Sequence, residues 1–235
     1  MKLLILDTSS KAASAALWED SVLRGEAYQN TGHTHSATSL PMAEQLLAGC
    51  GWSLSEVDGF AVTAGPGSFT GLRIGLASVK GMAFALDKPC VPLSTLEGLA
   101  YNLSGWPGLI CPVMDARVGQ VYTALFRWDG GAMHRLMEDA AIPAEELLTA
   151  LAAYGEPVTL VGDGALLSAE RFAGRLPGLA VAPEHLRNQR AGAMAPLAAR
   201  LFAEGQTVPA GDLVPRYLRL PQAERELKLK QQKGE

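Results

Sequence analysis

The segment of this sequence with the most potential for chemistry is a glycine-rich turn at residues 65–75, which reads GPGSFTGLRIG. Glycines let a backbone approach a ligand closely, and the N-terminus of a helix attracts anions. Ser68, Thr70 and Arg73 could therefore donate hydrogen bonds to a phosphate. The Lys-Ser/Thr ending of a P-loop and the G-x-G-x-x-G spacing of a dinucleotide site are both missing. On spacing alone, a tight turn whose glycines serve packing is the favoured interpretation.

Two carboxylates follow apolar runs, a position where α/β sheets often carry functional side chains. Asp7 ends the run 3–6, and Asp115 ends the run 109–114. No glycine follows Asp7, as a phosphate-wrapping hairpin would require, and Asp115 could instead form an ion pair with Arg117. Gly162 opens a Gly-Asp-Gly turn that could cradle a nucleotide but is as common in plain turns. We keep Asp7, Asp115 and Gly162 as vestigial nucleotide-site candidates and predict no bound cofactor.

Two histidines and several serines are the remaining candidates for metal binding and catalysis. His33 and His35 would point to the same side of an extended segment, so a metal pair is conceivable. The residues four positions later are Ala37 and Ser39, so a third ligand at helical spacing is missing. No serine stands in a G-x-S-x-G context. We therefore predict two solvated histidines, no metal and no catalytic residue.

Composition excludes several classes of protein. The 235 residues are 48% hydrophobic and carry a formal net charge of −4, so a buried core is expected and a basic surplus for gripping nucleic acid alone is absent. The cysteines, Cys50, Cys90 and Cys111, show no C-x-x-C spacing, which argues against a disulfide framework or thiolate zinc site. No apolar stretch approaches a membrane span of about 20 residues. We expect a soluble, cytoplasmic protein.

Hydrophobic periodicity predicts alternating strands and helices in the first half of the chain. Predicted strands cover residues 3–6, 60–63 and a short stretch from 91, with a hairpin formed by 13–18 and 22–28. Predicted helices cover 40–50, 68–86 and 96–103. Pro41 places the start of the first helix near residue 40 or kinks the helix there. Ser68 is the expected N-cap of the second helix.

The same order restarts after a Gly-Trp-Pro-Gly boundary at residues 105–108. A strand at 109–114, a hairpin from 118 to about 128 and beyond, a strand at 158–161 and helices at 144–153 and 192–204 are predicted. Both halves open with a strand that ends in an aspartate and continues into a hairpin, which indicates an internal duplication. The predicted division is a first lobe at 1–105, a second at 106–220 whose last helix packs back on the first lobe, and a disordered or loosely helical tail at 221–235.

The predicted helix at 68–86 carries a stripe of small residues. Gly71, Gly75 and Ser78 fall within one narrow sector at about 100° per residue. Such a stripe lets a second helix approach closely. The spacing does not say whether that helix belongs to this chain or to another.

Four segments together resemble the bacterial TsaB family, also called YeaZ. They are Ile5-Leu6-Asp7-Thr8-Ser9, the GPGSFTGLRIG run, Asp115-Ala116-Arg117 and Pro215-Arg216-Tyr217-Leu218-Arg219, and their order and spacing extend to about Leu220. The resemblance implies a two-lobed α/β actin-like, sugar-kinase-like ATPase (ASKHA) fold with mixed sheets flanked by helices. It also implies a non-catalytic subunit of the complex in which TsaD, with TsaE, transfers threonylcarbamoyl from threonylcarbamoyl-adenylate to adenosine 37 of ANN-decoding tRNAs.

The resemblance further implies a partner surface on two first-lobe helices, at residues 34–48 and 68–86. These helices would form a bundle with the matching helices of TsaD or, when TsaD is absent, of a second copy of this chain. The expected interface residues are Leu40, Ala43, Leu47, Phe69, Gly71, Leu72, Ile74, Gly75 and Ser78. Contact with tRNA is expected only through the complex, and no membrane is involved. The alternatives are an ATP-dependent transferase or kinase of the same fold, or a glycoprotease-like hydrolase.

Overall fold

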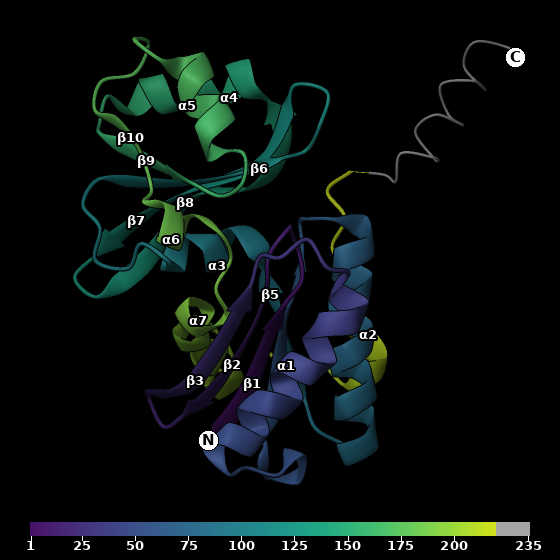
Figure 1. Ribbon diagram of the computed structural model, residues 1–235. Helices are drawn as coiled ribbons and strands as arrows, with labels where there is room; N and C mark the ends of the chain where they lie inside the picture. The colour runs from purple at the N-terminus through teal and green to yellow at the C-terminus, as the bar shows by residue number, and fades with distance from the viewer. Residues whose placement is uncertain (220–235) are drawn as a thin grey trace, which may run out of the picture.

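The computed structural model describes residues 1–219 and shows two lobes, each built on a five-stranded mixed sheet (Figure 1). The strands of the first sheet are β1 (Lys2–Asp7), β2 (Ala13–Glu19), β3 (Val22–Gln29), β4 (Gly59–Gly65) and β5 (Cys90–Ser94). Their order is β3-β2-β1-β4-β5. The central strand β1 pairs antiparallel with β2 and parallel with β4.

The second sheet repeats this topology. Its strands are β6 (Leu109–Asp115), β7 (Gln120–Asp129), β8 (Ala132–Pro143), β9 (Val158–Val161) and β10 (Leu179–Val181), in the order β10-β9-β6-β7-β8. The central strand β6 pairs antiparallel with β7 and parallel with β9. Each sheet is therefore a central strand, an antiparallel hairpin on one side and two parallel strands on the other. The predicted α/β class and the predicted internal duplication are both confirmed.

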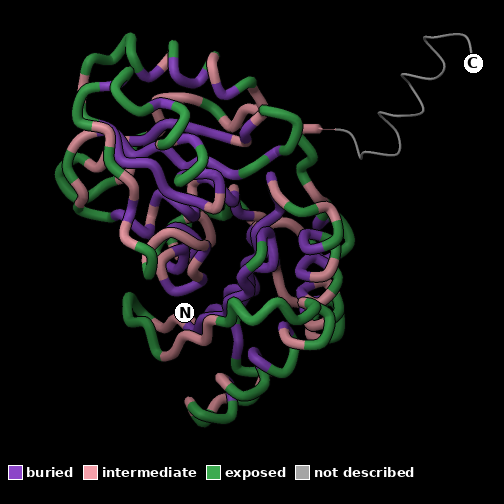
Figure 2. The backbone as a smooth tube through the Cα atoms, turned by 45° about the horizontal axis from the view of Figure 1, so that its top comes forward, coloured by how far each residue is buried: buried purple, intermediate pink, exposed green. Residues whose placement is uncertain are grey.

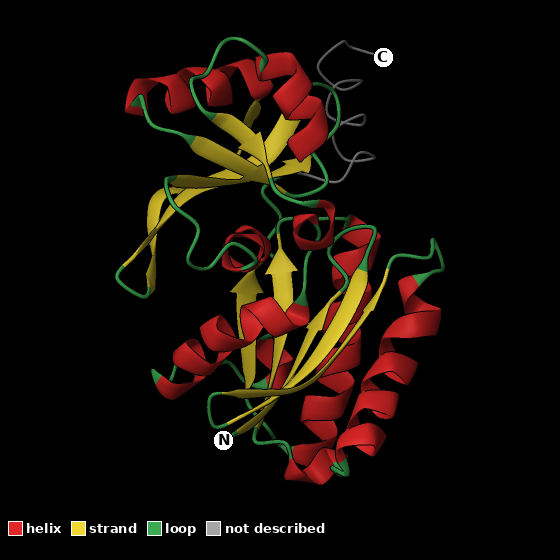
Figure 3. Cartoon of the chain, turned by 60° about the vertical axis from the view of Figure 1, so that its left-hand side comes forward, coloured by secondary structure: helices red, strands yellow, loops and turns green. Residues whose placement is uncertain are grey.

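Helices cover both faces of the first sheet (Figure 3). Helices α1 (His35–Cys50) and α2 (Phe69–Leu86) pack on one face, and α7 (Ala191–Ala203) packs on the other. Strand β1 serves both cores, because Leu4 and Leu6 face α1 and α2 while Leu3 and Ile5 face α7. A continuous apolar run is what a strand buried on two faces requires.

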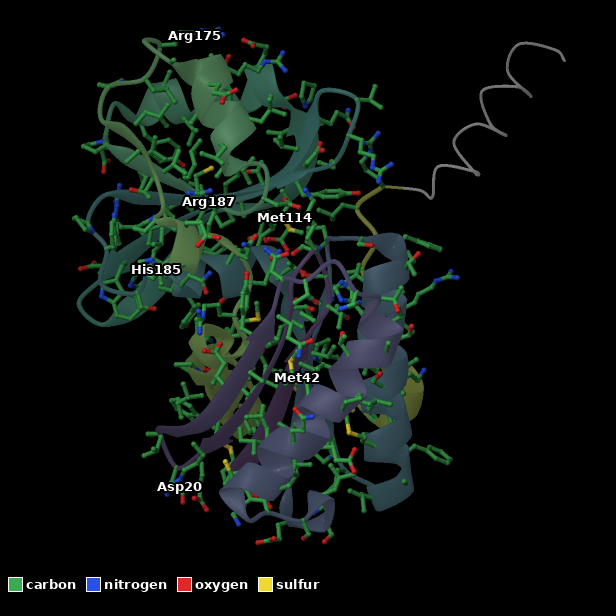
Figure 4. The ribbon with its side chains drawn as sticks, in the orientation of Figure 1. Asp20, Met42, Met114, Arg175, His185 and Arg187 are labelled. Carbon is green, nitrogen blue, oxygen red and sulfur yellow. The ribbon has the colours of Figure 1, made fainter. Side chains whose placement is uncertain are left out.

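The second sheet is covered by α4 (Ala144–Tyr154) and α5 (Ala165–Phe172) on one face and α3 (Thr95–Tyr101) on the other. Helix α3 leads from the first sheet to the second, and α6 (Glu184–Arg187) precedes α7. The central strands of both sheets are buried along nearly their whole length (Figure 2). Met114, near the end of β6, lies where the two lobes meet (Figure 4).

Three local features differ from the sequence-based prediction. Helix α1 begins at His35 rather than near residue 40, and Pro41 lies inside it. Pro41 is exposed, so water can satisfy the carbonyl that its missing N–H leaves free. Strand β7 begins at Gln120 rather than 118, because Arg117, Val118 and Gly119 all adopt left-handed backbone conformations. Helices α5 and α6 and strand β10 are short and were not predicted.

Helix α2 is the one helix among residues 1–219 that is long and apolar enough, on length and composition alone, to cross a membrane. One face of α2 belongs to the core of the first lobe, through Leu72, Leu76 and Val79. A core helix passes the same test of length and composition.

The chain returns to the first lobe after α7. Val208 exchanges two backbone hydrogen bonds with Cys90 at the edge of β5, and Lys80 on α2 donates to the Gly211 carbonyl. Residues 213–219, which we call the C-terminal strap, then cross the N-terminal end of α2. The last predicted helix is α7, which packs on the first sheet, whereas the division into lobes at residue 105 stays a prediction. The tail predicted at 221–235 lies outside the described residues.

Candidate functional site

The last residue of β1, Asp7, carries the most unusual polar group of the described chain. Asp7 is fully buried, and its Oδ1 accepts hydrogen bonds from Thr63 Oγ1 at 2.7 Å and from the Ser9 hydroxyl at 2.7 Å. Its Oδ2 has no hydrogen-bond partner among residues 1–219. Burial raises the pKa of the Asp7 carboxyl, and the hydrogen bonds from Thr63 and Ser9 oppose that rise. Burying a carboxylate with one unpartnered oxygen lowers the stability of the fold, and the group does not reach solvent.

The glycine-rich turn is filled by the chain itself. The Ser68 N–H donates to the Ser9 carbonyl at 2.7 Å, and a Cβ at Gly67 would also meet that carbonyl. A Cβ at Gly65 would clash with the Arg216 carbonyl. The backbone amide that could have received a phosphate thus already has a protein acceptor. These glycines serve packing, as the spacing favoured.

The side chains proposed as phosphate donors are also engaged. Ser68 is the N-cap of α2, as predicted, and its hydroxyl accepts from the Gly71 N–H. Arg73 donates to the Tyr217 hydroxyl at 3.0 Å, and its guanidinium lies 3.9 Å from the centroid of the Phe69 ring. Of the three proposed donors, only Thr70 has no side-chain hydrogen bond within residues 1–219. The nucleotide site that an ATPase fold implies is therefore not matched by this turn.

The two glycines of the small-residue stripe on α2 face inward. A Cβ at Gly71 or Gly75 would clash with Thr8, and the Thr8 hydroxyl donates to the Gly71 carbonyl at 2.7 Å. The assignment of Gly71 and Gly75 to a partner surface is wrong, because the residue that approaches them belongs to the loop after β1. Leu72, Ala43 and Leu47 are likewise part of the first-lobe core and are not available to a partner.

The outer faces of α1 and α2 are formed by other residues than the buried ones just described. Among the predicted interface residues, Leu40 is 45% exposed, and Phe69, Ile74 and Ser78 are half-buried. The structure adds Ala77, Gly81 and Phe84 to this face, and the Phe84 ring is 81% exposed. We call these seven residues the α1–α2 outer face. In the sequence this face corresponds to a second apolar stripe, in which Ile74, Ala77, Gly81 and Phe84 recur at helical spacing.

The two histidines do not form a metal pair. His33 is exposed and precedes α1, whereas His35 begins the helix and its Nε2 lies 2.7 Å from the Ser10 carbonyl oxygen. A carbonyl oxygen only accepts, so Nε2 carries a proton and is not free to bind a metal. No group of three or more potential metal ligands occurs among residues 1–219.

The second aspartate lies at the corresponding position of the second sheet. Asp115 is exposed, and its Oδ1 accepts from the Arg117 N–H at 2.7 Å. The ion pair considered for Asp115 and Arg117 is not formed. The Asp115 N–H donates to Asp163, whose pKa is raised by burial. Gly162 has a φ of 114°, and a Cβ there would clash with the Val113 carbonyl, so this glycine also serves packing.

Gln189 joins these loops at the lobe junction, and nothing in the sequence pointed to it. The side chain is fully buried. Its Oε1 accepts from the Ser10 hydroxyl at 2.6 Å, and its Nε2 lies 3.6 Å from the Met114 sulfur. A buried amide thus fills the space between the loop after β1 and the end of β6.

A cavity of about 540 Å³ lies beside Gly65 and Pro66 and is lined by both lobes. Its central charge is Arg135, which donates to Asp139 at 2.5 Å and to Glu97 at 2.9 Å. Asp139 also accepts from the Ser94 hydroxyl. Arg135 already neutralises both carboxylates, so these side chains are not free to bind a ligand. They join α3 to β8 instead.

Comparison with known proteins matches the family described as "TsaD: tRNA N6-adenosine threonylcarbamoyltransferase" to residues 28–225. The tRNA threonylcarbamoyladenosine biosynthesis protein TsaB of Bacillus subtilis (strain 168) is 33% identical over 95% of this chain and 96% of that protein. The TsaB protein of Escherichia coli (strain K12) is 34% identical over 93% of this chain and 95% of its own length.

Solved structures give the same answer. YeaZ from Pseudomonas aeruginosa has a TM-score of 0.80 and 30% sequence identity, and the match covers 92% of this chain and 99% of that chain. An activator of 2-hydroxyisocaproyl-CoA dehydratase from Clostridium difficile, with bound ADPNP, has a TM-score of 0.50 at 14% identity over 88% of this chain and 97% of that chain. This second likeness concerns the fold alone, which is the expected two-lobed ASKHA fold. The chain therefore belongs to the TsaB (YeaZ) family of tRNA threonylcarbamoyladenosine biosynthesis proteins.

Proposed function

We propose that this chain is a non-catalytic subunit that assembles with a TsaD-type transferase, and with TsaE, to transfer threonylcarbamoyl to adenosine 37 of ANN-decoding tRNAs. Two observations support the proposal. The glycine-rich turn that could have received a phosphate is occupied by the carbonyl of Ser9, while the α1–α2 outer face is left exposed and apolar. The first feature argues against nucleotide chemistry, and the second argues for a partner. We expect the protein in the cytoplasm.

The state of the candidate catalytic residues among residues 1–219 supports a non-catalytic role. Asp7 and Ser9 are hydrogen-bonded to one another and fully buried, so neither reaches a substrate. A general acid or base must lie within hydrogen-bond reach of the reacting group. The exposed Asp115 carboxylate accepts from the Arg117 N–H, and no histidine, lysine or carboxyl side chain within residues 1–219 is hydrogen-bonded to it. These residues provide no nucleophile–base pair.

The α1–α2 outer face supports the partner role. An exposed phenylalanine on a helix, beside the small residues Ala77 and Gly81, can insert between the helices of a partner. Gly81 has no heavy atom within 4 Å of the position of an added Cβ, so the surface there is open. The same face would pair two copies of this chain when TsaD is absent, since a two-fold interface uses one patch twice.

The test is co-purification with a TsaD-type partner, followed by a tRNA modification assay with and without this chain. Phe84→Asp should weaken association by about 2 kcal/mol, or roughly 30-fold in Kd, as expected for a buried aromatic anchor. Leu167→Asp is the matched control, because Leu167 is 66% exposed on α5 of the other lobe. Modification that proceeds equally without this chain, or ATP turnover by this chain alone, would contradict the proposal.

A further inference from the structure

We propose that four arginines around the C-terminal strap, Arg73, Arg117, Arg216 and Arg219, form a binding surface for the phosphate backbone of RNA. We call them the strap arginines. This inference rests on the proposed function, because that function brings a tRNA to the complex. The inference goes beyond the proposed function because it assigns part of the RNA contact to this chain rather than to its partners.

Three segments far apart in the sequence bring the strap arginines together. Arg219, at the end of the strap, donates to the carbonyls of Ala116 and Arg117 in the β6–β7 turn. Tyr217, two residues earlier, accepts from Arg73 on α2. The strap therefore links the N-terminal end of α2 to the turn of the second lobe. The three arginines other than Arg219 are exposed, and Arg219 is half-buried.

The strap arginines differ from the others in their partners. No carboxylate oxygen of residues 1–219 lies within 4.0 Å of their guanidinium nitrogens. Every other described arginine except Arg187 has such a carboxylate, and the paired residues are Arg24, Arg127, Arg135, Arg171, Arg175, Arg190 and Arg200. Within the described chain, carboxylates thus neutralise seven arginines and leave the strap arginines, together with Arg187, unmatched. A phosphate backbone supplies the missing negative charges.

The nearby carboxylates do not cancel this charge. Asp115 is the last residue of β6 and Asp163 follows β9, and each accepts from a backbone N–H rather than from a guanidinium. Glu138 and Arg216 both line the cavity beside Gly65, and no ion pair joins them. The surplus is local, because the whole chain carries a formal net charge of −4. A composition rich in basic residues does not explain the cluster.

The aromatic side chains favour RNA over an acidic protein surface. Tyr217 is exposed, and its ring stacks on Phe69 with centroids 4.9 Å apart. Arginine planes beside an accessible aromatic ring are the groups on which unpaired bases stack while phosphates bind the charge. An acidic protein would use the guanidinium groups but has no need of the ring.

The test measures binding of a fluorescent, unmodified tRNA transcript with an ANN-reading anticodon, by anisotropy, from about 50 to 200 mM salt. The titration is carried out with the isolated full-length chain and with its complex with the TsaD-type partner. Arg117→Gln and Arg216→Gln should each weaken binding several-fold at the lowest salt. Each should also lower the slope of log K against log salt by about 0.7 to 0.9, the amount expected for one lost phosphate contact.

The matched control is Lys88→Gln, which removes one positive charge just beyond the opposite end of the 18-residue helix α2. It should leave both the affinity and the slope unchanged. Unchanged slopes in both arginine variants would overturn the inference. So would loss of assembly, seen by light scattering, with unchanged RNA affinity, because the cluster would then face a partner protein. If the wild-type chain fails to assemble, the proposed function fails, while the titration of the isolated chain still decides the RNA surface.

Discussion

Thr8 lies directly against Gly71, and the Thr8 hydroxyl donates to the Gly71 carbonyl at 2.7 Å. This bond joins the loop after β1 to the first turns of α2. The helix can lie this close only because Gly71 and Gly75 have no side chain, since a Cβ at either position would clash with Thr8. The glycines of the most distinctive sequence motif therefore hold the first lobe together and do not meet a partner.

Gly75→Ala should destabilise the fold by about 1–3 kcal/mol, because the added methyl group overpacks a contact with Thr8 and Val62. Gly81→Ala in the same helix is the matched control. Its Cβ enters open space, so the variant should gain about 0.5–1 kcal/mol from helix propensity alone. Urea denaturation measures the stability of both variants, at protein concentrations where light scattering shows a monomer. Equal stabilisation by the two substitutions would show that Gly75 does not pack on Thr8.

Asp7→Asn should be at least as stable as the wild type at pH 7, and its advantage should disappear as the pH falls toward 4. Burial raises the pKa of Asp7 above its ordinary value of 3.8, so the folded state holds a proton that the unfolded state has released. Wild-type stability must then fall as pH rises from the unfolded pKa through the folded pKa. The asparagine oxygen keeps the hydrogen bonds from Thr63 and Ser9 and carries no charge.

The measurement for Asp7→Asn is the urea midpoint of both proteins from pH 4 to pH 8. Asp115→Asn is the control, because Asp115 is exposed and its charge is not buried on folding. A variant less stable than the wild type at pH 7 would show that the charged form of Asp7 is stabilised by a group that the described residues do not provide.

Gln189→Leu should cost about 1–3 kcal/mol of folding stability, because the Ser10 hydroxyl would lose its acceptor inside the junction of the two lobes. Leucine has nearly the shape of glutamine, so the loss of stability reflects the missing hydrogen bond more than a change in side-chain volume. Gln206→Leu, at an exposed position, should change stability by less than about 0.5 kcal/mol. Thermal unfolding of the two variants side by side decides the matter, and equal melting temperatures would remove Gln189 from this role.

Asp115→Ala and His35→Ala should each leave threonylcarbamoyl transfer by the reconstituted complex within a few-fold of the wild type. Asp115 accepts one backbone N–H that water can serve, and His35 contacts the Ser10 carbonyl rather than a metal. A general acid or base contributes about 100-fold or more. A loss of that size, with assembly of the complex intact, would restore a catalytic role to the residue concerned.

Metal analysis provides a separate check on the histidines. The purified chain should contain well under one equivalent of zinc or iron, because His33 is exposed and His35 directs its Nε2 to a carbonyl. A His33→Ala, His35→Ala double variant should have the same metal content as the wild type. Stoichiometric metal that this double variant lacks would contradict the structure at this site.

Local pattern determined much of the fold. The continuous apolar runs of β1 and β6 predicted strands buried on both faces, and each strand lies at the centre of its sheet. The repeat of strand, aspartate and hairpin predicted two lobes of one topology. These features depend on neighbouring residues, whose burial and hydrogen bonding impose a fixed period on the chain. Helix α2 was predicted almost to the residue because Ser68 caps it and its apolar stripe is long.

Only the tertiary structure decided which side of α2 is the surface. Helical periodicity placed Gly71, Gly75 and Ser78 in one sector, but a small residue suits a close contact inside the chain as well as one with a partner. The loop that fills this contact, at Thr8, lies more than sixty residues earlier. The buried Gln189 and the unmatched strap arginines likewise depend on segments separated by more than one hundred residues. Such contacts leave no period in the sequence, because their partners are chosen by how the sheets and helices pack.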